Sequence, residues 1–353
     1  MNSIPNSFKN HIPLDFKNVH TIPNSHEWTL PNDHTVAEPQ TFGSMPIINL
    51  SDPNAKSLIR HACEKWGVFQ VINHGVPLNL LNEVELLTHR LFSLPTHRKI
   101  CALRSPDGIT GYGLPQISSF FPKLMWTEGF TMVGSPVEHA TLLWPHQPNE
   151  QTNFCTVMEE YQKEMKKSTE RLVELMLGSL GLTSKDIEWL KPKTGCNKAQ
   201  SLLHLNSYPA CPEPDRAMGL GPHTDSSVVT VVYQSTCNGL QVHGDGIGWM
   251  AVQPIPGALV VNVGDLMHIL SNGQFKSPLH RAVVNKTRHR ISVAYFYGPP
   301  KDVKISPLTD HDHPPLYSPV TWKEYLGAKS MHFNNALELI KNNKNRNGVI
   351  SSK

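Results

Sequence analysis

The sequence lacks the features that define several large classes of protein. Its six cysteines are scattered and include no C-x-x-C pair, which argues against both a zinc ribbon and a disulfide framework. No apolar run approaches the length of a membrane-spanning helix, and the opening MNSIPNSFKNHIPLDF has no apolar segment of the signal-peptide kind. The net charge is only +3, with no basic block, so binding to nucleic acid is not expected. We therefore expect a cytoplasmic, monomeric protein.

What the sequence does contain is a pattern of metal ligands. His223 and Asp225 are spaced i, i+2, and residues with this spacing on a strand project from the same face. His280, from a later predicted strand, can complete a triangular set. Two histidines and one carboxylate are the ligands of non-haem Fe(II) oxygenases, in which the remaining positions stay open for cosubstrate and oxygen. We predict that His223, Asp225 and His280 bind the metal.

A second His-x-Asp pair, His243 and Asp245, needs a different interpretation. It includes Gly244 and is followed by Gly246, and Asp-Gly after the apolar run GLQV is typical of a tight hairpin turn. We predict that Asp245 lies in such a hairpin turn and that this pair binds no metal.

Arg290 and Ser292, which begin ten positions after His280, supply a planar bidentate donor and a hydroxyl. Such a pair suits the distal carboxylate of a 2-oxo acid. A zinc hydrolase on a similar barrel would leave both residues unexplained. We expect Arg290 to be the catalytic residue outside the metal ligands, and Arg290 and Ser292 together to bind the cosubstrate.

The order of predicted elements indicates an α+β fold with a mainly β core. After residue 199 the chain consists of short strands separated by turn residues, which is typical of an antiparallel barrel or jelly roll. We divide the chain into an extended N-terminal arm (1–44), an N-terminal α/β region (45–150), a long buttressing helix and linker (151–198), the jelly-roll core (199–300) and a C-terminal helical segment and tail (301–353).

Capping residues predict where three helices begin. Asp52 suits the N-cap of the first helix, and capping boxes at Thr156 and Thr321 indicate a long helix over about 156–180 and a final helix. Trp28 is predicted to pin the arm against the body of the protein.

Several ordered motifs resemble those of the plant 2-oxoglutarate/Fe(II)-dependent dioxygenases, over nearly the whole chain after residue 45. They are PIINL…ACEKWGVFQVINHGV in the first half and NSYPACPEPDRAMGLGPHTD, NVGDLMHILSNGQFKS, LHRAV and RISVA in the second. The resemblance implies a double-stranded β-helix, with Fe(II), 2-oxoglutarate as cosubstrate, and ascorbate. It also implies that Tyr208 donates a hydrogen bond to 2-oxoglutarate and that Asn206 lies near its metal-side end.

Within that family, the segment 111–136 and the C-terminal VTWKEYL resemble the gibberellin 3-beta-dioxygenases. The resemblance implies 3β-hydroxylation of a small diterpenoid acid, a gibberellin precursor, with molecular oxygen. Gibberellin 20-oxidases and 2-oxidases share the same metal and cosubstrate positions, so they and the flavonoid-type enzymes stay open as alternatives. The intact ligand set argues against a catalytically silent jelly-roll binding protein.

Aromatic residues in that segment could form the walls of a substrate site, and Lys123 could pair with the carboxylate of the substrate. Core aromatics and a solvated lysine are equally compatible with the sequence. The four aromatic residues are Phe120, Phe121, Trp126 and Phe130.

Overall fold

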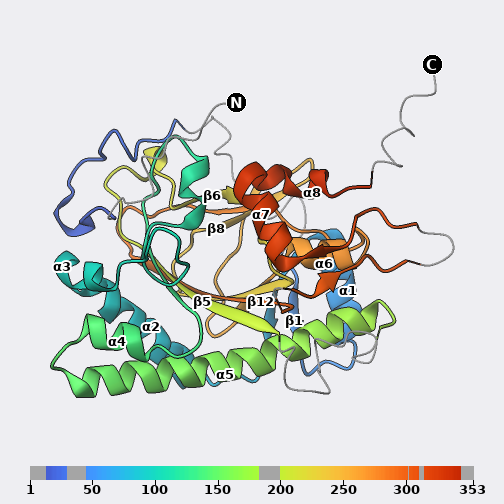
Figure 1. The fold of residues 1–353 in the computed structure, drawn as a ribbon, viewed down its shortest axis with the longest axis horizontal. Helices are drawn as coiled ribbons and strands as arrows, with labels where there is room; N and C mark the ends of the chain where they lie inside the picture. The colour runs from blue at the N-terminus through green and yellow to red at the C-terminus, as the bar shows by residue number, and fades with distance from the viewer. Residues whose placement is uncertain (1–12, 30–44, 183–198, 301, 310–313, 343–353) are drawn as a thin grey trace.

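The computed structural model describes residues 13–29, 45–182, 199–300, 302–309 and 314–342. The parts of the predicted arm at 1–12 and 30–44, the predicted linker at 183–198 and the predicted tail at 343–353 lie outside the described residues. The described part of the chain contains a mainly β core covered by helices, as the sequence predicts (Figure 1).

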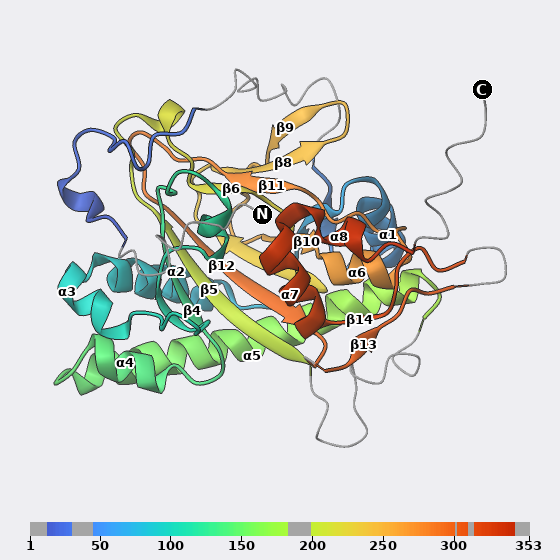
Figure 2. The ribbon, with the colours of Figure 1, turned by 45° about the horizontal axis from the view of Figure 1, so that its top comes forward.

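Two β-sheets form this core, and the smaller sheet lies above the larger one in Figures 1 and 2. The larger sheet has the order β1 (Ile47–Asn49), β2 (Val68–Ile72), β10 (Leu259–Val263), β7 (Val229–Gln234), β12 (Arg290–Gly298), β5 (Gln200–Tyr208), β4 (Glu128–Met132) and β3 (Gly111–Gly113). The smaller sheet has the order β6 (Leu220–His223), β11 (His280–Ala282), β8 (Leu240–Gly244) and β9 (Gly248–Ala251). A two-stranded ribbon, β13 (Lys304–Ile305) with β14 (Val320–Thr321), precedes the C-terminal helices.

Helix α5 (Pro148–Ser179) runs along the outer face of the larger sheet in Figure 1, whereas α7 (Trp322–His332) and α8 (Ala336–Leu339) lie on the side of the smaller sheet. The other described helices are α1 (Ala55–Lys65), α2 (Leu78–Ser93), α3 (Thr96–Lys99), α4 (Val137–Leu143) and α6 (Asp265–Leu270). Short 3₁₀ turns occur at Phe16–Asn18, Ile100–Ala102, Gln116–Phe120, Pro214–Arg216 and Phe333–Asn335. No described helix is both long enough and apolar enough to cross a membrane.

Strand β5 shows how the sequence divides the two faces of the larger sheet. Leu203 and Leu205 are fully buried in the main core, together with residues of α5. Because side chains alternate along a strand, His204, Asn206 and Tyr208 project from the opposite, inner face. The apolar residues therefore fix which way the polar residues of β5 point.

The predicted helix starts are correct in one case and wrong in two. Thr321 is the N-cap of α7, and it forms the capping box with Glu324. Helix α5 begins at Pro148, so Thr156 lies inside it, because proline at the first turn already starts the helix. Helix α1 begins at Ala55, and Asp52 instead accepts a hydrogen bond from the backbone N–H of Asn54.

The described part of the arm contacts the body through Trp28, as predicted. Its indole Nε1–H donates to the carbonyl of Leu124 (2.8 Å), and its backbone N–H donates to the carbonyl of Arg216 (2.8 Å). The strand predicted to carry His223 and Asp225 is β6, but it covers only Leu220–His223.

Candidate metal centre and its surroundings

His223, Asp225 and His280 converge at one end of the smaller sheet. His223 ends β6, His280 begins β11, and the two are register partners, with ring centroids 4.3 Å apart. Asp225 lies two residues beyond the end of β6, so the predicted strand stops one ligand early. One potential ligand atom from each of the three residues lies within 4.8 Å of the other two. The sequence therefore predicted correctly which residues come together.

Hydrogen bonds orient both histidines toward Asp225. The Nδ1–H of His223 donates to the carbonyl of Gly221 (2.8 Å), and the Nδ1–H of His280 donates to the carbonyl of Pro278 (3.1 Å). A carbonyl can only accept, so the proton of each neutral ring is on Nδ1 and the lone pair is on Nε2. The two Nε2 atoms lie 3.7 and 3.8 Å from the carboxylate oxygens of Asp225. This arrangement is that of metal-ligating histidines with a fixed tautomer.

The protonation states also suit a metal. Burial lowers the pKa of His223 to about 3, and the neighbouring His280 adds to this effect. Burial works against ionisation of Asp225, but the two histidines, a hydrogen bond from Thr230 and the charge of Lys329 together outweigh it, so the pKa of Asp225 is lowered. Near neutral pH the site therefore offers a neutral imidazole and a carboxylate, which are the forms that bind metals.

An unpartnered oxygen completes the case for a cation. Asp225 is 4% exposed, and its Oδ2 has no hydrogen-bond partner among the described residues. Leaving a buried carboxylate oxygen unpaired is costly. A divalent cation between Asp225 and the two Nε2 atoms would satisfy it, so these residues fit the predicted Fe(II).

The residues predicted to bind the cosubstrate lie together on the inner face of the larger sheet. Strands β12 and β5 are antiparallel neighbours, and their register pairs Arg290 with Tyr208 and Ser292 with Asn206. The Arg290 guanidinium lies 5.0 Å from the centre of the Tyr208 ring. Burial raises the pKa of Tyr208, so this phenol keeps its proton and can donate.

Arg290 is a buried cation that has hydrogen-bond donors without a partner. It is 3% exposed, and its Nη2 donates to the side-chain oxygen of Gln234 (2.9 Å). Its Nε and Nη1 have no hydrogen-bond partner in the described part of the chain, and neither does Oδ1 of Asn206. A guanidinium held in this way matches the two oxygens of a carboxylate. No sequence pattern indicates Gln234, which the pairing of β7 with β12 places beside Ser292.

A hydrogen-bond network around Asp265 lies behind the candidate metal ligands, and no pattern in the sequence predicts it. Asp265 begins α6, is 0% exposed and accepts hydrogen bonds from Thr224 (3.0 Å) and Ser277 (2.7 Å). From α7, Lys329 lies 2.5 Å and the Tyr325 hydroxyl 2.7 Å from the same carboxylate. Thr224 lies between two of the candidate ligands in sequence, so Asp265 connects α7 to the candidate metal centre.

Two of the predicted wall residues, Phe120 and Phe121, lie near β6 together with two further aromatic residues, Trp28 and Phe333. Phe120 stacks on Phe333 (4.4 Å between ring centroids), and Phe121 contacts the rings of Phe333 (5.5 Å) and Trp28 (5.2 Å). The Phe121 ring fills the space that a Cβ on Gly221 would need, two residues before His223.

The other candidates for the substrate site lie elsewhere. Trp126 is fully buried and donates to the carbonyl of Pro209 (3.2 Å), and Phe130 belongs to the main core. Lys123 is on the surface, where its ammonium donates to the carbonyl of Asn24 (2.6 Å). Trp126 and Phe130 are therefore core residues.

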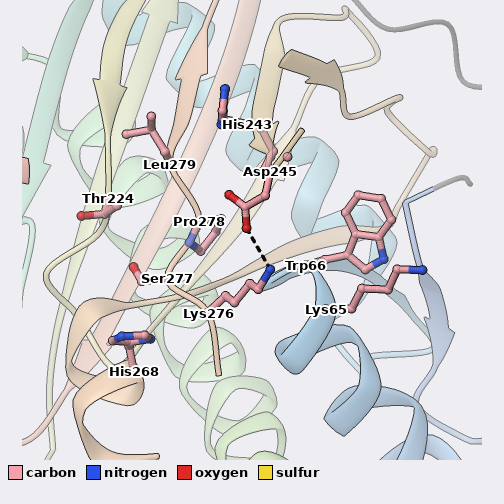
Figure 3. Close-up of a pocket in the computed structure, with 12 residues that line it drawn as sticks. Lys65, Trp66, Thr224, His243, Asp245, His268, Lys276, Ser277, Pro278 and Leu279 are labelled. Atoms are coloured by element: carbon pink, nitrogen blue, oxygen red, sulfur yellow. Dashed lines mark hydrogen bonds and ion pairs between the residues drawn. The ribbon is translucent and has the colours of Figure 1, made fainter. Parts of the chain in front are cut away.

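The second His-x-Asp pair lies in the hairpin between β8 and β9, as predicted. Figure 3 shows Asp245 directed toward Lys276, to which it is bonded at 3.1 Å. His243 contacts the ring of Trp249 (5.2 Å), and the hairpin lines a pocket of about 330 Å³. The metal-ligand cluster in the described residues does not include this pair.

Comparison with known proteins agrees with this site. Residues 199–299 match the 2OG-Fe(II) oxygenase superfamily, and residues 45–153 match the family described as non-haem dioxygenase in morphine synthesis N-terminal. The chain belongs to the 2OG-Fe(II) oxygenase superfamily.

Within this superfamily, the chain is most similar in sequence to gibberellin 3-beta-dioxygenases among the relatives described here. The chain is 55% identical to gibberellin 3-beta-dioxygenase 1 of Pisum sativum, over 84% of this chain and 80% of the relative. It is 54% identical to gibberellin 3-beta-dioxygenase 3 of Arabidopsis thaliana, over 86% of this chain and 89% of the relative. Among solved structures, JOX2 in complex with 2OG, Fe and JA is similar with a TM-score of 0.77 and 30% identity, over 92% of this chain and 95% of that one. The jelly-roll fold is thereby confirmed.

Proposed function

We propose that this protein is a 2-oxoglutarate- and Fe(II)-dependent dioxygenase that hydroxylates gibberellin precursors at the 3β carbon. The proposal rests on sequence similarity, because the chain is 55% and 54% identical to gibberellin 3-beta-dioxygenases of two plants. The convergence of two histidines, an aspartate and an unpaired buried arginine supports the chemistry independently.

In this proposal His223, Asp225 and His280 would hold Fe(II), which would supply the activation of oxygen. The residues around them keep both imidazoles in the Nδ1–H tautomer and hold Asp225 ionised.

Arg290 and Ser292 bind the distal carboxylate of 2-oxoglutarate, and Tyr208 donates a further hydrogen bond. The free Nε and Nη1 of Arg290 support this role. Asn206, the register partner of Ser292, lies near the keto-acid end. Fixing the cosubstrate at both ends orients it before the reaction and excludes water from the carboxylate.

The overall reaction balances without another oxidant. One oxygen atom of O2 enters a C–H bond of the gibberellin as a hydroxyl, and the other enters 2-oxoglutarate. The 2-oxoglutarate loses carbon dioxide and becomes succinate. The residues of the chain then decide which C–H bond faces the metal.

The test is incubation of the purified protein with Fe(II), 2-oxoglutarate, ascorbate and a gibberellin precursor that lacks the 3β hydroxyl. We expect the 3β-hydroxylated product with one succinate per product, measured by mass spectrometry. Oxidation at carbon 20 or hydroxylation at carbon 2 as the main reaction would assign the protein to a sister group. Turnover of a flavonoid but of no gibberellin would refute the proposed substrate, while the proposed iron- and 2-oxoglutarate-dependent chemistry would stand.

We also propose a cytoplasmic monomer that uses ascorbate. The five described cysteines are all free thiols, which suits a reducing compartment. Light scattering of the purified protein tests the monomer, a fluorescent fusion tests the compartment, and omission of ascorbate tests the reductant.

A further inference from the structure

A gibberellin precursor carries a carboxylate, and the residues discussed so far provide no buried partner for it. Arg290 is assigned to the cosubstrate, and Lys123 lies on the surface, bonded to a backbone carbonyl. On the basis of the function proposed above, we propose that Arg104 binds the carboxylate of the acid substrate.

The fold around Arg104 fixes its position firmly. It follows the 3₁₀ turn Ile100–Ala102, and its backbone N–H donates to the carbonyl of Tyr112 in β3 (2.9 Å). The preceding residue, Leu103, forms a β-bridge with Tyr112. Tyr112 is itself held by the buried Glu128, which its hydroxyl contacts at 2.6 Å. Arg104 is thus tied to the edge of the larger sheet.

The Arg104 guanidinium lies over the inner face of that sheet. Its Nη2 is 3.3 Å from the position that a Cβ on Gly113 would occupy, and Gly113 pairs with Gly129. Gly129 in turn pairs with Asn206 of β5. Directly paired residues of antiparallel strands project to the same face, so Arg104 shares the face that carries Asn206 and Arg290.

The two glycines make room for this arrangement. A side chain at Gly113 would meet the Arg104 guanidinium, and a Cβ at Gly129 would come within 3.0 Å of the His204 ring. The row from Ser292 through Asn206 and Gly129 to Gly113 crosses three interstrand spacings, or about 14 Å. Two carboxylic acids can therefore bind at once, one at Arg290 and one at Arg104, without competing.

Arg104 has charge and donors available. It is half-buried, and it forms no ion pair with any described residue. One N–H of its five donates to the carbonyl of Leu114. Burial lowers the pKa of Arg104, and burial together with the charge of Arg104 lowers the pKa of His204 to about 4. Because His204 is neutral near neutral pH, Arg104 contributes the one positive charge at this place, and that charge can pair with one carboxylate.

The chain after Arg104 connects this cation to the metal. Leu114, whose carbonyl accepts from Arg104, is followed by the turn Gln116–Phe120 and then by Phe121. Phe121 packs on Gly221, in the strand that carries His223. An apolar polycycle anchored by its acid at Arg104 would pass along this segment toward the metal.

The test compares Arg104→Gln and Arg104→Lys with the matched control Lys123→Gln. For each protein, kcat/KM is measured for a gibberellin precursor, for the methyl ester of its carboxyl group and for 2-oxoglutarate. We expect Arg104→Gln to lower kcat/KM for the acid roughly ten- to a hundredfold, the effect of losing a charge-assisted hydrogen bond. Its values for the ester and for 2-oxoglutarate should stay close to those of the wild type. Arg104→Lys should recover part of the activity on the acid, and Lys123→Gln should change nothing.

Equal losses on acid and ester would show that Arg104 only supports the backbone of Leu114, and would overturn the proposal. A selective loss in Lys123→Gln would overturn it in favour of the surface lysine. If Arg104→Gln does not fold, Arg104→Lys and the wild-type preference for acid over ester decide instead, and a wild type that uses both equally refutes an anchor. A wild type that hydroxylates no gibberellin but consumes 2-oxoglutarate with another substrate refutes the proposed function, and the anchor with it.

Discussion

Replacing Arg290 by Lys tests the cosubstrate site most directly. The change keeps a positive charge on the inner face of β12 but removes the planar fork. The wild-type side chain has two buried donors, Nε and Nη1, without a partner, while Nη2 is bonded to Gln234. A lysine at this position can place one ammonium near the carboxylate and cannot donate from two parallel N–H groups.

The expected loss follows from those unpartnered donors. Losing one charge-assisted hydrogen bond costs about 1.5–3 kcal/mol, so the apparent affinity for 2-oxoglutarate should fall roughly ten- to a hundredfold. The affinity for iron should change little, because Arg290 is not among the metal ligands. Gly239→Ala should produce a similar defect without changing any charge, because a Cβ there would lie 2.6 Å from Cδ of Arg290.

The assay is the KM for 2-oxoglutarate at saturating iron and substrate, with iron affinity measured separately. Arg171→Lys is the matched control, because Arg171 donates to the carbonyl of Leu50, away from the site. If Arg290→Lys leaves the KM for 2-oxoglutarate unchanged, Arg290 does not bind the cosubstrate carboxylate.

Three further outcomes are expected. Replacing any of the three metal ligands by Ala should abolish turnover while the circular dichroism spectrum persists, and full activity at saturating iron would remove that residue from the site. Asp265→Asn should lower the free energy of unfolding by about 3–5 kcal/mol, because it breaks a buried pair with Lys329; urea titration measures this, and a loss below about 1 kcal/mol would contradict it. The pKa of His204 is about 4 in the folded state against 6.5 normally, so the unfolded chain binds the extra proton and stability falls as pH decreases from 6.5 to about 4. Thermal unfolding across this window should depend less on pH in His204→Gln, and an unchanged slope would show that this histidine does not contribute.

The candidate metal ligands and the residues proposed to bind the cosubstrate could be singled out from the sequence because their signals are local or strongly patterned. The spacing of His223 and Asp225, and of Arg290 and Ser292, shows side chains that can act together. Alternating apolar residues such as Leu203 and Leu205 show which face of the strand is buried. The family motifs then indicate the jelly roll, which the structure and its relatives confirm.

The supporting residues could not be predicted, because they meet only in three dimensions. Asp265, Thr224 and Lys329 come from three segments that are far apart in sequence, and their hydrogen bonds form only when these segments pack together. Gln234 becomes relevant only through the register of β7 and β12. Likewise, Thr156 has the sequence of a capping box, yet Pro148 starts the helix two turns earlier.

The register of β5 and β12 determines how this protein can change during evolution or engineering. A shift of one residue in either strand would turn its polar side chains from the inner face into the apolar core. One inserted codon within Gln200–Tyr208 or Arg290–Gly298 would therefore remove the proposed cosubstrate site, even if the strands paired again. The turn between β8 and β9, where Asp245 is exposed, is free of this constraint. Variation in length should accumulate there, while the lengths of β5 and β12 stay fixed.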